Sequence, residues 1–415
     1  MKKFERLFNV PLRVLALLVA FSVAGCGSGG GGDSGNGNGI QILTSDTVPG
    51  APGAIAPGTT GTASGPTVSS SNPSNGATNV SVSIVGSDNL VTPRTFSATF
   101  SETMSPATIV SPASSFTVKE TVSGNHVTGN VSMNASNTIA TFTPSAILTN
   151  NTQFTAIVTT APTNPVGSAL VSSYGWSFTT GAHIGQAPIN LGTAASFLVL
   201  GGTSIDNVST ALNPTRVNGQ FGIDPGRATN VTGFSDSTPV GTGIILTGGI
   251  QSGSIVSQAK TDLSAALNEA NARTHNQVPI GTSDLSSTVV PGGSPGVYPP
   301  GLYSSVSSLA LGAGNMTLDA KGDPDAVWVF KAGSQLIVGD TRQILLLNGA
   351  KASNIFWALG SSANIGDQVG FKGNILAGSS NTIGTASAMG TTVEGRVLSV
   401  SGLHLYATTI SAPAP

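Results

Sequence analysis

Residues 350–376 read AKASNIFWALGSSANIGDQVGFKGNIL and decide the fold of the C-terminal half. Two short apolar segments in this stretch, Ile355-Phe356-Trp357-Ala358 and Gly373-Asn374-Ile375-Leu376, are separated by glycine and small polar residues. Similar segments recur at intervals of roughly twenty residues, a coil length that suits a β-solenoid, where stacked backbones satisfy one another's hydrogen bonds. The recurring segments are Val327-Trp328-Val329-Phe330, Ile344-Leu345-Leu346-Leu347 and Gly395-Arg396-Val397-Leu398. We therefore predict a mainly β protein with a β-solenoid over 184–415.

One segment within this region has a helical period. From Ser254 to about Thr274 the apolar residues fall on one stripe, formed by Ile255, Ala259, Leu263, Ala266, Leu267 and Ala270. The other face is polar, and Glu269 and Arg273 stand four residues apart, where opposite charges pair on a helix. The pattern predicts a single long helix that covers one apolar flank of the solenoid.

Residues 67–181 have the period of two that half-buried strands show. Thr95-Phe96-Ser97-Ala98-Thr99-Phe100, Ile139-Ala140-Thr141-Phe142 and Phe154-Thr155-Ala156-Ile157-Val158 alternate apolar and polar residues between turn clusters. A region of this size predicts an Ig-like β-sandwich. The short motifs around Asn72-Pro73, Phe100-Ser101-Glu102 and Trp176-Ser177-Phe178 resemble those of bacterial Ig-like modules in surface proteins. We therefore expect a spacer without catalytic residues.

The N-terminus has the features of an export signal. Lys2, Lys3, Arg6 and Arg13 precede a short apolar stretch that ends in Val23-Ala24-Gly25-Cys26, which resembles a bacterial lipobox. We predict a signal peptide over 1–25, acylation of Cys26 and a Gly/Ser/Thr/Pro-rich flexible tether over 26–66. Because Gly27 and not Asp follows the cysteine, we expect an anchor in the outer membrane or at the cell surface.

Composition excludes several classes of function. Charged residues make up 8% of the chain and its net charge is −2, so neither a nucleic acid nor an acidic membrane surface is an expected partner. The four histidines are scattered, no metal or cofactor is expected, and the Gly292-Gly293-Ser294-Pro295-Gly296 match to a nucleophile motif lies in a Pro/Gly loop. Asp319, Asp323 and Asp325 form either a solvated turn or, less favoured, a Ca²⁺ site. We expect no enzyme.

A set of short sequence motifs, in a fixed order around the predicted helix, resembles the ice-binding protein family of cold-living bacteria, fungi and algae. Before the helix stand residues 191–197 (LGTAASF), 219–226 (GQFGIDPG) and 231–234 (VTGF); after it stand 300–303 (PGLY), 326–330 (AVWVF), 350–357 (AKASNIFW) and 393–396 (VEGR). The resemblance covers nearly all of 189–410. It implies a right-handed, discontinuous β-solenoid with three faces and a helix along one of them.

The resemblance also implies a function without a reaction. One flat face with Thr, Ser and Asn would adsorb to ice through ordered water, and low charge suits such a face. The family's motif there, Thr-(Ala or Gly)-any-(Thr or Asn), is matched only in part: Met389-Gly390-Thr391-Thr392 keeps the glycine and the final threonine, whereas Asp367-Gln368-Val369-Gly370 does not fit. Asp340 and Arg342 also bring charge where the family prefers small or hydroxyl residues.

The candidate ice-binding residues are therefore drawn from more than one face. They are Thr210, Asn213, Thr215, Thr341, Thr382, Thr385, Ser387, Thr391 and Thr392. The expected function is ice binding by a surface-tethered monomer whose partners are ice and, through Cys26, a membrane. The alternative is a non-enzymatic adhesion or envelope module that uses the same solenoid for another ligand.

Overall fold

The structure is a computed structural model that describes residues 65–110, 115–208, 213–234, 244–281 and 284–414. The described residues from Gly65 onward belong to one compact unit. The predicted signal peptide, Cys26, nearly all of the tether and Thr210 lie outside the described residues. In the part of the chain that is described, no helix is long and apolar enough to span a membrane.

The N-terminal part is a sandwich of two four-stranded sheets, so the predicted Ig-like fold is confirmed. One sheet has the order β1 (Val68–Asn72), β5 (Phe96–Phe100), β8 (Ile139–Pro144) and β7 (Gly129–Met133). The other has the order β2 (Ala77–Val80), β10 (Tyr174–Thr180), β9 (Gln153–Val158) and β6 (Phe116–Glu120). Alternate residues of both sheets point into a core of Phe and Trp side chains, and a short helix, α1 (Pro106–Val110), packs beside it.

A small third sheet joins this sandwich to the C-terminal part of the chain. The hairpin of β3 (Ser83–Val85) and β4 (Val91–Pro93) pairs through β3 with β11 (Ile184–Gln186), the first strand after the sandwich. The connection is therefore part of a sheet and not a free linker.

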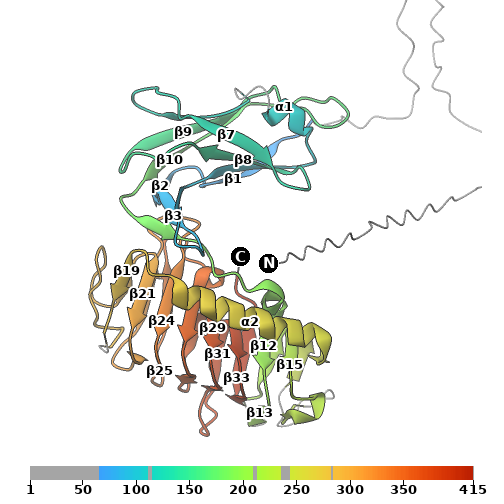
Figure 1. Ribbon diagram of the computed structural model, residues 1–415, viewed down its shortest axis with the longest axis vertical. Coiled ribbons are helices and arrows are strands. Elements are labelled where there is room, and N and C mark those ends of the chain that lie inside the picture. The colour runs from blue at the N-terminus through green and yellow to red at the C-terminus, as the bar shows by residue number, and fades with distance from the viewer. Residues whose placement is uncertain (1–64, 111–114, 209–212, 235–243, 282–283, 415) are drawn as a thin grey trace, which may run out of the picture. The chain divides into compact units, whose positions relative to one another are not determined.

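From residue 197 onward the chain forms a β-solenoid with three faces (Figure 1). The helix face comprises β18 (Ile250–Gln251), β15 (Gln220–Ile223), β12 (Phe197–Gly201), the second halves of β31 (Thr391–Ser399) and β29 (Gly370–Ala377), β27 (Ile355–Leu359), β24 (Trp328–Ala332), β21 (Gly301–Ser305) and β19 (Gln277–Pro279). The short-strand face comprises β16 (Val231–Thr232), β13 (Ile205–Val208), β32 (Leu403–Tyr406), β30 (Asn381–Ile383), β28 (Ala363–Ile365), β25 (Leu336–Val338) and β22 (Leu309–Leu311).

The third face is here called the threonine face. It comprises β17 (Ile244–Thr247), β14 (Arg216–Asn218), β33 (Thr408–Ser411), the first halves of β31 and β29, β26 (Ile344–Leu347), β23 (Met316–Asp319) and β20 (Val297–Tyr298). Strands β29 and β31 serve two faces because their first and second halves have different neighbours: β33 pairs with Thr391–Glu394, whereas β12 pairs with Val397 and Leu398. Short 3₁₀ turns, η1 (Gly192–Ser196), η2 (Ala228–Asn230) and η3 (Ala352–Asn354), connect the strands.

The order of coils in space differs from their order in the chain. The first solenoid strands lie against the last ones, since β12 pairs with β31, β13 with β32 and β14 with β33. Helix α2 (Ser254–Ala272) carries the chain from this first segment along the helix face, and the later coils then return to meet the start (Figure 1). With 19 residues the helix is about 28 Å long, enough to cross some six strands spaced about 4.8 Å apart.

Helix α2 has the predicted bounds to within two residues, but its buried stripe begins one residue later than expected. Val256 is buried and Ile255 is 66% exposed; Ala259, Leu263, Ala266, Leu267 and Ala270 are buried as predicted. They pack on outward side chains of the helix face, among them Leu302, Val329, Phe356, Leu376 and Leu398. The Glu269–Arg273 pair forms, but Arg273 is fully buried and not on the exposed side of the helix.

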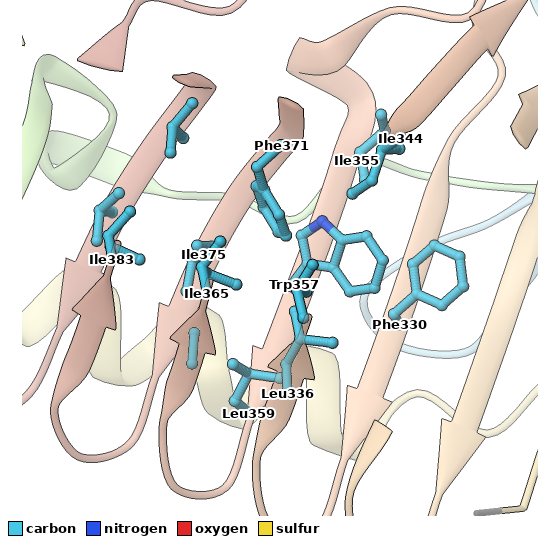
Figure 2. Close-up of a cluster of buried hydrophobic side chains, with 14 of the residues drawn as sticks. Phe330, Leu336, Ile344, Ile355, Trp357, Leu359, Ile365, Phe371, Ile375 and Ile383 are labelled. Carbon is cyan, nitrogen blue, oxygen red and sulfur yellow. The ribbon is translucent and has the colours of Figure 1, made fainter. Parts of the chain in front are cut away.

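The interior of the solenoid holds a stack of aromatic rings (Figure 2). Phe330 and Trp357 lie face to face in adjacent coils with ring centroids 4.3 Å apart, and Phe371 continues the stack at 5.5 Å from Trp357. The indole N–H of Trp357 donates to the carbonyl oxygen of Lys372 at 3.0 Å, so burial leaves this polar group satisfied. Asn374 and Asn381, both fully buried, likewise bond to backbone groups of neighbouring coils.

The paired glycines of β29 and β31 give a stability prediction. Gly395 is in register with Gly373, and a Cβ at Gly395 would collide with the Gly373 carbonyl group, which belongs to the backbone and cannot move aside. Gly395→Ala is expected to destabilise the solenoid by about 3 kcal/mol or more, measured by urea unfolding of the full chain. The control is Gly175→Ala in β10, where a Cβ meets only ordinary contacts at 3.8 Å. Equal stability of the two variants would show that the close contact between Gly395 and the Gly373 backbone does not require glycine.

Candidate functional site

Two of the three solenoid faces are open to solvent. The helix face is covered by α2, and Lys260 of the helix donates from its ammonium group to the carbonyl oxygen of Val400 at 2.7 Å, which fastens the helix to a corner of the solenoid. Burial lowers the pKa of Lys260 to about 8, although the charge of Asp224 acts in the opposite direction. A large flat surface for a partner therefore has to be the short-strand face or the threonine face.

The short-strand face presents one outward column of mixed chemistry. In register along it stand Ala310, Ile337, Asn364, Thr382, His404 and Asp206. Ile337 is 42% exposed, and the His404 ring lies 3.6 Å from the Asp206 carboxylate, which also accepts a hydrogen bond from the Thr232 hydroxyl at 2.7 Å. The predicted residue Thr382 is half-buried. Its neighbours in the column are Asn364 and His404, so no second hydroxyl group stands beside it.

The threonine face contains a shallow groove built from a repeated tetrad. Gly390-Thr391-Thr392-Val393, Ala407-Thr408-Thr409-Ile410 and Pro214-Thr215-Arg216-Val217 lie side by side, because Thr392 pairs with Thr409 and Thr409 with Arg216. The groove has a volume of about 350 Å³ and is lined by Asn213, Pro214, Arg216, Gly390, Thr391, Thr392, Ala407 and Thr409. We call this set the threonine groove.

The second residue of each tetrad points inward. Thr391, Thr408 and Thr215 are 2%, 0% and 0% exposed. The Thr391 hydroxyl donates to the Gly366 carbonyl at 2.8 Å, the Thr408 hydroxyl donates to the Ile383 carbonyl at 3.1 Å, and the Thr215 hydroxyl accepts from the Thr408 N–H at 3.1 Å. Two of the predicted site residues, Thr215 and Thr391, therefore fasten neighbouring coils and present no hydroxyl to a surface.

The third residue of each tetrad points outward. Thr392 and Thr409 are exposed, in register on adjacent strands that are about 4.8 Å apart, and Arg216 follows in the same column. Asn213 at the rim is exposed and donates to the Ala388 carbonyl at 3.0 Å. Thr409 was not among the predicted residues, but aligning the three tetrads on their aliphatic fourth residue would have found it.

Charged residues limit the extent of this surface. Beside the threonine column, Lys372 and Glu394 form an ion pair at 2.6 Å, and both side chains are partly exposed. The Lys372 ammonium lowers the pKa of Glu394 through its hydrogen bond, while burial acts against this. Further along the face, β26 exposes Leu345 and Leu347. The uncharged hydroxyl-bearing patch is thus short.

The corner between the short-strand and threonine faces is held by carboxylates. Asp367, which opens the segment that does not fit the family motif, is 4% exposed and accepts hydrogen bonds from the N–H and hydroxyl groups of Thr385 in the next coil. Asp340 repeats the arrangement one coil earlier, where its carboxylate accepts the Asp367 N–H at 2.8 Å. Although Asp367 stands where the family prefers small or hydroxyl residues, its carboxylate is buried and bonds along the corner, so it places little charge on the face.

The other predicted residues of this corner lie in turns. Thr341 has a positive φ of 66°, and its hydroxyl donates to the Asp340 carbonyl at 2.6 Å. The Thr385 hydroxyl is bonded to Asp367, and Ser387 is exposed in the following turn, where its N–H donates to the Thr385 hydroxyl at 3.3 Å. Thr210 lies outside the described residues. Of the predicted set, only Asn213, Thr391 and Thr392 line the threonine groove, and Thr215 is buried next to it, where its hydroxyl accepts the Thr408 N–H.

The three aspartates suggested as a turn or a Ca²⁺ site have other partners. Asp319 pairs with Lys321 at 2.9 Å and Asp323 with Arg94 at 3.1 Å, so the solvated-turn interpretation is wrong for these two. Burial alone would raise the pKa of Asp323, but the Arg94 charge and several hydrogen bonds outweigh it and hold the pKa below its ordinary value. Within the described residues, no group of His, Cys, Asp and Glu side chains is arranged to hold a metal ion.

Comparison with known proteins agrees with this architecture. A family described as "Ice-binding-like" matches residues 199–411, and a bacterial Ig-like domain family matches 62–180. An ice-binding protein of Nostoc sp. (strain HG1) is 35% identical over 213 residues, which cover 51% of this chain and 69% of that protein. An ice-binding protein of Leucosporidium sp. (strain AY30) is 30% identical over 240 residues, covering 54% of this chain and 84% of that protein. Among solved structures, an ice binding protein from an Antarctic biological consortium aligns with a TM-score of 0.47 at 36% identity, over 55% of this chain and 93% of that one.

The corner carboxylates give a second stability prediction. Asp367→Ala removes the acceptor of two hydrogen bonds from Thr385, and bonds to a charged group contribute about 1.5–3 kcal/mol each. We expect the free energy of unfolding to fall by about 3 kcal/mol or more, with a smaller loss for Asp367→Asn, which keeps one amide oxygen as acceptor. The matched control is Glu102→Ala on an exposed turn. A change at Asp367 no larger than that at Glu102 would show that the corner does not depend on the carboxylate.

Proposed function

Because the chain belongs to the ice-binding-like family, we propose that its solenoid adsorbs to ice and that the threonine groove is the centre of the adsorbing surface. The observation that carries the proposal is the pair of outward threonines, Thr392 and Thr409, held in register on adjacent strands beside a floor of Gly390 and Ala407. Their hydroxyls can hold water, while their methyl groups limit competing hydration. Such water-mediated contacts can be nearly as favourable as direct hydrogen bonds.

Three features of the structure support this surface over the others. Helix α2 excludes the helix face. The short-strand face carries the His404–Asp206 pair and an exposed isoleucine in the outward column that contains Thr382. The buried hydroxyls of Thr391, Thr408 and Thr215 fix the spacing of the coils under the groove, which gives a rigid array of outward groups. The mechanism is adsorption and requires no catalytic residue and no second copy of the chain, so we propose a monomer.

The charged neighbours of the groove suggest modest potency. Arg216 occupies the place in the third tetrad where Thr392 and Thr409 stand in the other two, and the Lys372–Glu394 pair borders the threonine column. Ammonium, guanidinium and carboxylate groups hold their own water, which competes with the ordered layer that ice requires. An adhesive or recrystallisation-inhibiting role therefore suits the surface better than strong depression of the freezing point.

A two-site variant tests the choice of face. Thr392→Lys combined with Thr409→Lys places two long charged side chains in the groove, and we expect loss of most thermal hysteresis and of partition into a slowly growing ice crystal. Folding should be unchanged, since both positions are exposed. The matched control, Asn364→Lys with Thr382→Lys, puts the same charges on the short-strand face and should keep full activity. The opposite result would move the site to that face, and loss in neither variant would exclude both assignments.

We further propose that the protein acts at the cell surface on a lipid anchor. The support is the lipobox-like sequence ending in Cys26 and the glycine-rich tether after it, together with an Ig-like module of the kind found in surface proteins. Each buried CH₂ of an acyl chain contributes about 0.8 kcal/mol, so several chains would hold the protein firmly.

The anchor can be tested independently of ice. In a Gram-negative host, Cys26→Ala should abolish incorporation of labelled palmitate and move the protein from the membrane fraction to the soluble fraction. Ser28→Ala, two residues away, serves as the control and should leave both unchanged. Palmitate incorporation by the Cys26→Ala chain would contradict the proposal.

A further inference from the structure

The sandwich and the solenoid are joined by a buried ion pair that the spacer interpretation does not anticipate. Arg94, next to β4, and Asp323, on the loop between β23 and β24, are 2% and 1% exposed. The guanidinium donates to both carboxylate oxygens of Asp323, at 3.2 Å and 3.1 Å. This bidentate geometry is the strongest form of such a contact, and a buried charge that loses its partner is strongly destabilising.

Further hydrogen bonds complete the coordination of these two charges. Arg94 also donates to the Ser81 hydroxyl at 2.7 Å and to the Asp325 carboxylate at 2.8 Å. The Ser81 N–H donates to Asp323 at 3.1 Å, and the Asn72 amide donates to Asp325. Asn72, Ser81 and Arg94 of the N-terminal part thus bond to two aspartates of the same short loop. Together with Asp323 and Asp325 they are here called the junction cluster.

A second point of contact lies at the C-terminus of helix α2. Asn89, at the tip of the β3–β4 hairpin, donates from its amide to the Ala272 carbonyl at 3.0 Å and accepts the Thr274 N–H at 2.8 Å. It therefore caps a helix end whose last carbonyl groups have no partner within the helix. The hairpin thus bonds to the element that covers the helix face.

The segment that connects the two parts is itself held in place. Strand β11 pairs with β3, and the fully buried guanidinium of Arg273 donates to the carbonyl oxygens of Ala187 and Pro188, which come directly after that strand. Lys331 of β24 donates to the Arg273 carbonyl at 2.7 Å, which ties the same point to the solenoid. A flexible hinge between 184 and 188 would have to break all of these contacts.

We propose that the Ig-like sandwich is a built-in structural part of the solenoid, locked to it by the junction cluster, so that the two move and unfold as one body. The sandwich then stabilises the loop 319–325 and the end of α2. It is not an independent domain on a flexible linker. The proposal does not depend on what the solenoid binds.

The test uses the full chain and compares Arg94→Ala with Lys119→Ala, a change of a partly exposed lysine in the same sandwich. The unchanged protein and the control should show one calorimetric transition. Arg94→Ala should show two, and its cleavage by a protease within 181–190 should be faster by roughly a hundredfold, because the uncompensated Asp323 charge opens the junction. One transition and unchanged cleavage in Arg94→Ala would overturn the proposal.

Two further variants separate the lock from a general loss of folding. Arg94→Met with Asp323→Leu replaces the ion pair by apolar side chains and should restore single-transition unfolding, since such exchanges of buried pairs are tolerated. Asn89→Ala removes only the contact with the helix end and should increase cleavage without splitting the transition. Suppose that the Met/Leu variant keeps the strand content of the unchanged protein, measured by circular dichroism, but shows two transitions and cleavage as fast as that of Arg94→Ala. Closing the junction with apolar side chains would then not restore joint unfolding, and the proposal would be overturned.

Discussion

The spacing of hydrogen-bonded parallel strands, about 4.8 Å, is the constraint on which the solenoid depends. Each coil places its residues directly over those of the next, so a group that has no partner within its own coil must find one in the coil above or below. The face-to-face contact of Phe330 and Trp357, the amide bonds of Asn374 and Asn381, and the inward threonines of the groove are all solutions to this requirement. The same spacing sets outward groups in rows, which is what an adsorbing surface needs.

The long strands and the helix arise from the same constraint. A stack of coils leaves two unpaired ends and one wide apolar face, and α2 covers that face with six buried side chains while it carries the chain from one end to the other. As a result, strands from the first and the last part of the solenoid become neighbours: β33 lies between β31 and β14. The threonine groove exists only because of this interleaving, since its three tetrads come from residues 214–217, 390–393 and 407–410.

This interleaving also explains what the sequence could and could not predict. Local periodicity was sufficient for α2, for the sandwich strands and for the apolar segments of the solenoid, because each depends on neighbours a few residues away. The orientation of a threonine in a corner depends on where the coil turns, and so Thr391 and Thr392 were grouped although one points inward and the other outward. Arg94 and Asp323 are 229 residues apart, and no local pattern connects them.

The scarcity of charge, which the sequence left open to several interpretations, has a structural meaning once the partners are known. Arg94, Arg273, Lys260 and Lys331 all donate to backbone or carboxylate oxygens at points where one element meets another. Asp323 and Asp367 act in the same way as acceptors of N–H groups. In a chain whose surface is mainly hydroxyl and amide, a charge is most useful where it can be buried and bonded several times, because there its desolvation is offset. Few charges remain exposed on the threonine face, above all Arg216 and the Lys372–Glu394 pair. These residues therefore set the size of the uncharged surface that this face can offer.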